Sequence, residues 1–372
     1  MTNAYDSLAV RPAGPWTPHF ENDSGTVEAD PCPDNSLPGV REYLAAINVA
    51  GVALFAVCGV AVLCVVLLYA DTLKHILRKA PPEVKTNSAF VLSVYPVVAV
   101  ATYCAMVVPR AHLLAEAVTQ GIFTAALYQM FCLCVSCAGG EAQIIALLSD
   151  GSLSLQVGPC CCWPCCCCCL PDLAVTKRHI RMLRILVLQL PVIQALVHMV
   201  LLVMWAEEES LYHVNYMFFQ PLVAISILFG IWGMTMTVRM LATPLSQHKL
   251  NLKFIVLQMV LFLSKLQGLI TRIILWTNVF PCKPPISPAV YVNVIYNTMM
   301  IAEMVALCFL ARILYVGDLG KKKTPDEEAD MRTAVQAHLD GLALREERLA
   351  SSPLGGINVV SQIAPGKLWH LT

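Results

Sequence analysis

Eight cysteines fall within ten consecutive positions of the stretch GPCCCWPCCCCCLP, which runs from Gly158 to Pro171. Thiols at this density could form disulfides, bind zinc or carry acyl chains as thioesters. Zinc ligands usually come as two spaced pairs that converge on one tetrahedron, whereas here only Cys162 and Cys165 have the pair spacing on their own. We therefore predict no metal. The choice between disulfides and acylation depends on which side of a membrane the run occupies.

Three ionisable residues, Lys265, Arg272 and Glu303, lie inside long apolar segments. Because charge is costly there and is usually kept for a function, these three are the candidates for the transport path. Lys265 and Arg272 are seven residues apart, so they share one face of a helix and could together bind an anionic group. Arg272 could instead extend toward the lipid headgroups. Lys265 and Glu303 fall at similar depths in neighbouring segments, so a purely structural ion pair between them is the alternative.

The elements that hold these residues are membrane-spanning helices. The 372-residue chain is 57% hydrophobic and 13% charged, whereas soluble domains are about 25% charged. We predict an all-α membrane protein, because seven stretches reach the roughly 20 apolar residues that cross a bilayer. These spans are residues 47–70, 88–108, 118–138, 185–205, 214–238, 254–277 and 289–310.

The basic residues of the loops predict the orientation, because basic loops stay on the cytoplasmic side. The second, fourth and sixth loops hold only Arg110 and Lys283. The N-terminus is therefore predicted outside and the C-terminus in the cytoplasm. The odd-numbered loops hold the larger set: Lys74, Arg78, Lys79, Lys85, Lys177, Arg178, Arg181, Arg184, Arg239, Lys249 and Lys253.

This topology assigns chemistry to the loops and the N-terminal segment, residues 1–46. That segment contains one glycosylation sequon, at Asn22, and begins without a signal-peptide pattern. Cys32 and Cys282 are the only cysteines on the predicted oxidising side, so we predict a disulfide between them. The cysteine run falls on the reducing side, which favours palmitoylation over disulfides, although an unmodified apolar loop is the alternative. The palmitoylation candidates are Cys160, Cys161, Cys162, Cys165, Cys166, Cys167, Cys168 and Cys169.

Residues 313–372 form the predicted cytoplasmic tail, which follows the transmembrane domain at 47–312. Thr324 and Pro325 precede three acidic residues, a pattern that predicts a helix near 325–350. Met331, Val335, Leu342 and Leu349 lie roughly on one side of it. This helix could dock on the membrane surface or on a partner, or it could remain solvated.

The Gly-Pro and cysteine run between the third and fourth spans resembles the alpha subunit of the organic solute transporter. Glu303 is matched to that family and Lys265 is not, so Glu303 is favoured over Lys265 as a residue of the transport path. Further matching positions follow in the family's order over roughly residues 40 to 316: Pro109-Arg110, Glu116, Gly139-Gly140-Glu141, Lys253-Phe254, Gln258, Gln267, Cys282-Lys283-Pro284-Pro285 and Arg312.

The resemblance implies facilitative, sodium-independent transport of bile acids, conjugated steroids and similar anionic amphipaths across the plasma membrane, basolateral in polarised cells. It also implies a single-span beta subunit as partner, beside the membrane lipids. The residues suggest neither an enzyme nor a cofactor, and the equal numbers of basic and acidic residues suggest no nucleic-acid partner. A seven-span receptor and a palmitoylated lipid-organising or trafficking scaffold are the alternatives.

Overall fold

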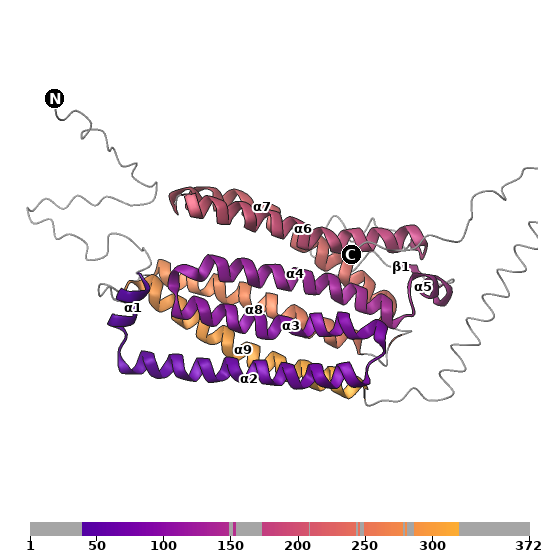
Figure 1. Ribbon diagram of the computed structural model, residues 1–372. Helices are drawn as coiled ribbons and strands as arrows, with labels where there is room; N and C mark the ends of the chain where they lie inside the picture. The colour runs from indigo at the N-terminus through magenta and orange to yellow at the C-terminus, as the bar shows by residue number, and fades with distance from the viewer. Residues whose placement is uncertain are drawn as a thin grey trace, which may run out of the picture.

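Seven long helices run side by side along one axis (Figure 1). The computed structural model describes residues 39–148, 152–153, 173–207, 209–242, 245, 249–277, 280 and 286–319. Within these residues, seven helices are long and apolar enough to cross a membrane. The prediction of an all-α membrane protein with seven spans is therefore confirmed.

The helices alternate in direction, so their connections gather at two ends of the bundle. We name these the α1 end and the α5 end, after the short helices α1 (Val40–Ala46) and α5 (Glu141–Leu147). A single 3-10 turn, η1 (Pro109–Ala111), precedes α4. The seven long helices are α2 (Val49–Lys79), α3 (Pro82–Val107), α4 (His112–Cys137), α6 (Lys177–Glu207), α7 (Glu209–Ala242), α8 (Leu250–Trp276) and α9 (Pro288–Leu319).

Local chemistry explains several helix ends. The side chain of Asn48 caps α2 by accepting a hydrogen bond from the amide of Gly51 at 2.9 Å. Pro82 is the first residue of α3. An amide proton at this position has no partner within the helix, so the proton that proline lacks is not missed. After α4 the chain turns through Gly139 and Gly140 at φ values of 83° and 98°, which residues with side chains rarely adopt. These glycines allow Glu141 to begin α5 directly.

Two very short strands stand at the α5 end. β1 (Ser152–Leu153) pairs antiparallel with β2 (Leu173–Ala174), with Ser152 opposite Ala174. The pair brings together the two ends of segment 154–172, which includes the cysteine run and lies outside the described residues.

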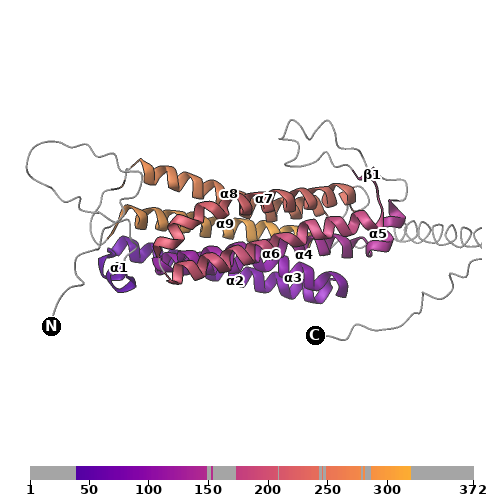
Figure 2. The same ribbon diagram turned by 90° about the horizontal axis from the view of Figure 1, so that it is seen from above.

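α3 is the most buried of the long helices, and α2 is the least. α3 packs against α2, α4 and α9, while α8 packs mainly against α9. Figure 1 shows α6 and α7 as a pair beyond α4, on the opposite side of α4 from α2, and Figure 2 shows the same bundle from above, with α6 crossing over α4. The centre of the core consists of fully buried apolar side chains from six of the long helices, including Val94, Val98, Leu127, Met130, Val187, Met234, Leu257 and Met304.

The pair of α6 and α7 is held by two kinds of close contact. Gln189 donates to the carbonyl oxygen of Ser226 at 2.9 Å and accepts from the Ser226 hydroxyl at 2.8 Å. Four residues further on, Gly230 lies so close to α6 that a Cβ there would stand 1.9 Å from Cδ1 of Leu190. Small residues at helix contacts in membranes let the backbones approach in this way.

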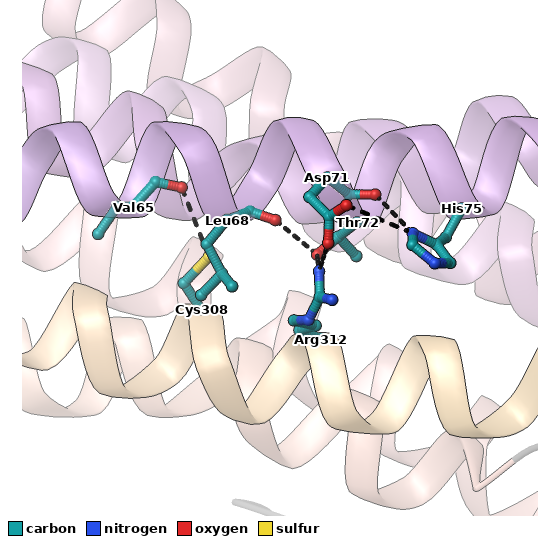
Figure 3. A network of polar contacts seen from close by, with 7 residues as sticks. All are labelled: Val65, Leu68, Asp71, Thr72, His75, Cys308 and Arg312. Carbon is teal, nitrogen blue, oxygen red and sulfur yellow. Dashed lines mark hydrogen bonds and ion pairs between the residues drawn. The ribbon is translucent and has the colours of Figure 1, made fainter.

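The first and last spans meet near the α5 end in a polar network (Figure 3). Arg312 of α9 pairs with Asp71 of α2 and also donates to the hydroxyl of Thr72 at 3.4 Å. One turn earlier on α9, the thiol of Cys308 lies 3.9 Å from the carbonyl oxygen of Val65. His75 completes the network 3.7 Å from the Asp71 carboxylate. This network joins two helices that are far apart in the sequence.

α1 docks on the α1 end through Tyr43, which is 2% exposed. Its hydroxyl donates to the carbonyl oxygen of Met106, in the last turn of α3, at 3.2 Å. Burial raises the pKa of Tyr43 to about 12, so the phenol keeps its proton at neutral pH. This hydrogen bond therefore satisfies one of the carbonyl groups that the end of a helix leaves unpaired.

Candidate functional site

A cavity of about 610 Å³ opens among α3, α4, α8 and α9 toward the α1 end of the bundle. Its place follows from the residues that line it, because those of α4 lie between His112 and Gln120, at the start of that helix, and those of α8 lie between Ser264 and Leu275, in its second half. A smaller space of about 20 Å³ between α4, α6 and α7 has several of the same lining residues. The volume of the large cavity falls in the range of roughly 300–1,000 Å³ that holds small-molecule ligands.

Two of the residues singled out in the sequence, Lys265 and Arg272, line this cavity. They lie two turns apart on α8, so one helical face carries both cations. Lys265 also borders the smaller space. The charges that act on its ammonium group are those of Glu116, which attracts it, and Arg272, which repels it. The structure therefore places two positive charges along one wall of the cavity.

Glu116 is the carboxylate of the same cavity. α4 begins at His112, six residues before the predicted start of the third span, so Glu116 lies within the helix. Sequence reasoning matched Glu116 to the family but assigned it no role, because it precedes the continuous apolar stretch. Its position on α4 brings it to the cavity opposite α8, where it borders both spaces together with Lys265.

Uncharged polar side chains hold the α9 wall of the cavity in place. The hydroxyls of Tyr296 and Ser264 lie 3.1 Å apart and join α9 to α8. Asn293 donates to the carbonyl oxygen of Ala105 at 3.1 Å and so joins α9 to α3. Asn297, which is buried, donates back to Asn293 at 2.8 Å. Each of these lining groups has a partner in the wall, which gives the cavity a fixed shape.

The remaining lining is largely apolar and includes one indole ring. Such a surface can cover the hydrocarbon body of a ligand while the cations hold its polar end. The apolar lining residues include Leu113, Trp205, Leu269, Leu275, Val292 and Met300.

Glu303, the favoured transport-path candidate, is not among the residues that line the cavity. It does not meet Lys265 either, so the ion pair given as an alternative is wrong. Gln267 of α8 instead donates a hydrogen bond from Nε2 to Oε1 of Glu303. Residues 265 and 267 are separated by about 200° around a helix, so only one of the two can face α9 at this depth. The sequence placed Lys265 and Glu303 at similar depth in the membrane. Depth alone does not tell which way around the helix axis each side chain points.

The contact between Gln267 and Glu303 leaves two buried oxygens without a donor among the described residues, Oε1 of Gln267 and Oε2 of Glu303. Loss of one partner from a buried hydrogen bond costs about 1–3 kcal/mol. We expect Gln267→Ala and Glu303→Ala to be non-additive in the free energy of unfolding of the detergent-solubilised protein.

Lys265→Ala combined with Glu303→Ala is the matched comparison. Because these side chains do not meet, we expect the sum of their single effects within roughly 0.5 kcal/mol. A clear coupling energy in this second cycle, together with additivity in the first, would show that Glu303 faces Lys265 after all.

His198 of α6 borders the smaller space. Its Nδ1 lies 2.8 Å from the carbonyl oxygen of Gln194, so that nitrogen carries the proton and donates. The remaining candidates lie outside the described residues: the palmitoylation sites from Cys160 to Cys169, Asn22, the pair Cys32 and Cys282, and the helix near 325–350. They stay predictions.

Several positions that matched the family in sequence make contacts between helices. Glu141 at the start of α5 pairs with Arg184 of α6, and the ammonium of Lys253 lies 4.7 Å from the ring centroid of Tyr315, joining α8 to α9. The contacts of Gln267 with Glu303 and of Arg312 with Asp71, described above, belong to the same set. These residues hold the bundle together, whereas Lys265 and Arg272 point into its cavity.

Seven spans with an amphipathic cavity between them define a multi-pass membrane protein that can hold a small organic molecule. The chain belongs to the organic solute transporter Ostalpha family, whose sequence profile matches residues 54–319. It is therefore a membrane transporter of organic solutes, as the resemblance predicted.

Individual relatives agree with this assignment. This chain is 22% identical to organic solute transporter subunit alpha from Danio rerio over 305 residues, which are 81% of this chain and 93% of the relative. It is 27% identical to organic solute transporter alpha-like protein from Drosophila melanogaster, over 67% of this chain and 75% of the relative. The chain is 24% identical to organic solute transporter subunit alpha from Leucoraja erinaceus, over 67% of this chain and 71% of the relative. No solved structure matches the chain.

Proposed function

We propose that this protein carries anionic amphipaths, such as bile acids and conjugated steroids, by facilitative, sodium-independent transport. The observation that carries the proposal is the cavity in which Lys265 and Arg272 stand on one wall of α8. A sulfate or carboxylate accepts charge-assisted hydrogen bonds from such groups, which are among the stronger polar contacts in proteins. Sodium independence comes from the resemblance.

The apolar lining supports the second half of the proposed solute. A steroid-like body is rigid and hydrophobic, so it gains free energy wherever it leaves water for an apolar wall. Trp205, Leu269 and Leu275 offer such a wall near the two cations. A small ion without an apolar body would make no contact with the apolar wall, and an uncharged apolar solute would offer no anionic group to the two cations.

We propose that the chain works at the plasma membrane with a single-span beta subunit. The name "subunit alpha" of the Danio rerio and Leucoraja erinaceus relatives implies a second subunit. In polarised cells, the resemblance suggests the basolateral membrane.

Uptake of labelled taurocholate and estrone sulfate into cells tests this function. We expect uptake when the chain is expressed with a candidate beta subunit, at an unchanged rate when choline replaces sodium. Because facilitative transport follows the gradient, preloaded cells should lose the same solutes into solute-free medium.

Surface biotinylation provides the necessary control for expression. A chain that reaches the surface with its beta partner but moves neither solute would contradict the proposal and favour a receptor or a scaffold. Uptake that stops when sodium is removed would leave the solute class intact and contradict the facilitative mechanism.

A further inference from the structure

The smaller space between α4, α6 and α7 adjoins the large cavity. Its volume is about 20 Å³, and a space of roughly 10–15 Å³ is enough for one water molecule. It therefore has room for one water molecule or one hydroxyl group, but not for a ring. Five residues line both spaces and form the passage between them: Leu113, Glu116, Gln120, Gln220 and Lys265.

Gln120 of α4 is the most buried polar residue of this passage, since its side chain is only 4% exposed. Among the described residues, none donates a hydrogen bond to its amide oxygen Oε1, which is buried. A buried acceptor without a donor is destabilising. The last side-chain torsion of glutamine is broad and roughly two-fold, so the amide group can turn its oxygen toward the smaller space. A donor that entered this space would therefore relieve an unpaired group.

The neighbours of Gln120 favour a hydroxyl group as that donor. Nδ1 of His198 carries the proton of the ring, so the neutral ring keeps an acceptor at Nε2. The carboxylate of Glu116 is a further acceptor beside the smaller space. A cation in the same place would meet the ammonium group of Lys265, which borders the space as well. A hydroxyl group is neutral, and it both donates and accepts.

We propose that the smaller space binds one hydroxyl group of the solute, which donates to Oε1 of Gln120. This inference rests on the proposed function and narrows its substrate class to hydroxylated amphipaths. The apolar body of the solute stays in the large cavity. A hydroxyl group can reproduce the hydrogen bonds that a water molecule would make in the smaller space, whereas a hydrogen atom at the same position of the solute cannot. A site of this kind discriminates against an analogue that lacks the hydroxyl group.

The test compares taurocholate, whose steroid nucleus carries hydroxyl groups, with cholanoyltaurine, the same conjugate without them. Gln120→Met removes the amide group and keeps the length of the side chain. In cells that also express the beta subunit, we expect this variant to lower the initial uptake of taurocholate about fivefold, the factor that one neutral hydrogen bond contributes. Uptake of cholanoyltaurine should stay at the wild-type rate. Each variant is compared with the wild type for the same solute, so differences in membrane partition between the solutes cancel.

A second variant fills the space and leaves Gln120 in place. Ala117 lines the smaller space but not the large cavity, and Ala117→Val adds methyl groups there. We expect the same selective loss of taurocholate uptake. Gln194→Met is the matched control, because Gln194 is 1% exposed and its amide atoms also lack partners among the described residues. Gln194 does not line either space, so any loss should be equal for the two solutes.

Equal losses for the two solutes in Gln120→Met and Ala117→Val, at a normal surface amount, would overturn the proposal. That result is expected if the smaller space holds only a structural water molecule. A loss confined to taurocholate in Gln194→Met would overturn it too, because that glutamine is outside both spaces.

Thermal stabilisation of the purified complex by the same two solutes requires no transport. If cells move neither solute, but taurocholate stabilises the wild type and Gln120→Met weakens this effect alone, the proposed function fails and the hydroxyl site is supported. If Gln120→Met changes the stabilisation by both solutes equally, or by neither, the hydroxyl site is wrong whatever the uptake shows.

Discussion

Replacing Lys265 with glutamine is expected to lower uptake of taurocholate and estrone sulfate by at least tenfold, with a normal amount of protein at the cell surface. The reason is that a hydrogen bond to a charged group contributes about 1.5–3 kcal/mol, and glutamine at this position cannot neutralise an anion. Lys265 borders both the large cavity and the smaller space. It forms no ion pair with an acid among the described residues, so its charge is available to a solute. Initial uptake rates, divided by the surface amount, measure the effect.

Two variants make this result specific. Lys265→Arg keeps the positive charge and should retain most of the uptake, although the guanidinium is larger and planar. Lys79→Gln removes an exposed lysine from the last turn of α2, at the α5 end, and should leave uptake unchanged. If Lys265→Gln transports normally, or if Lys79→Gln loses as much, the cationic wall of α8 does not bind the solute.

Replacing Gly230 with alanine is expected to cause the largest loss of folded protein among the conservative substitutions considered. The new Cβ would stand 1.9 Å from Cδ1 and 2.3 Å from Cγ of Leu190, which is itself 1% exposed. Since Leu190 is enclosed, the clash must be relieved by moving α6 away from α7. Overpacking of this kind costs about 1–3 kcal/mol, enough to reduce the amount of protein at the surface several-fold.

A second substitution that relieves the clash and a control substitution at another glycine test this explanation. Leu190→Ala removes the atoms that clash, so the double variant Gly230→Ala with Leu190→Ala should be more stable than the two single losses predict. Gly121→Ala on α4 adds a Cβ into space with no atom within 4 Å. It should therefore keep the wild-type thermal midpoint in detergent. Alanine is the better helix former at both sites, so equal losses from Gly121→Ala and Gly230→Ala would mean that the contact with Leu190 does not cause the loss at Gly230.

The seven spans could be predicted from the sequence because the requirement is simple. Backbone polar groups in hydrocarbon must be satisfied within a helix, and such a helix needs about 20 apolar residues. The stretch that became α2 shows this plainly, as it is the most hydropathic of the seven. Lys265 and Arg272 were also found from the sequence, because charges inside apolar stretches are rare and seldom without a role.

The cavity could not be predicted, because it depends on which helices touch. Hydropathy gives depth but not direction around the helix, so Lys265 and Gln267 could not be told apart as partners of Glu303. Glu116 received no role because α4 extends past its apolar stretch into polar residues that face the cavity. Gly230 did carry a signal: with Gly233 it places two glycines on consecutive turns of an apolar helix, a pattern typical of close helix contact.

The contact between α2 and α9 also bears on how the chain is made. α2 leaves the ribosome first among the spans, and its partner Arg312 leaves last. Until α9 has entered the membrane, Asp71 lacks its guanidinium, and the thiol that approaches Val65 is absent. Translation that stops before residue 288 would therefore leave α2 with an unmatched acid beside the membrane surface.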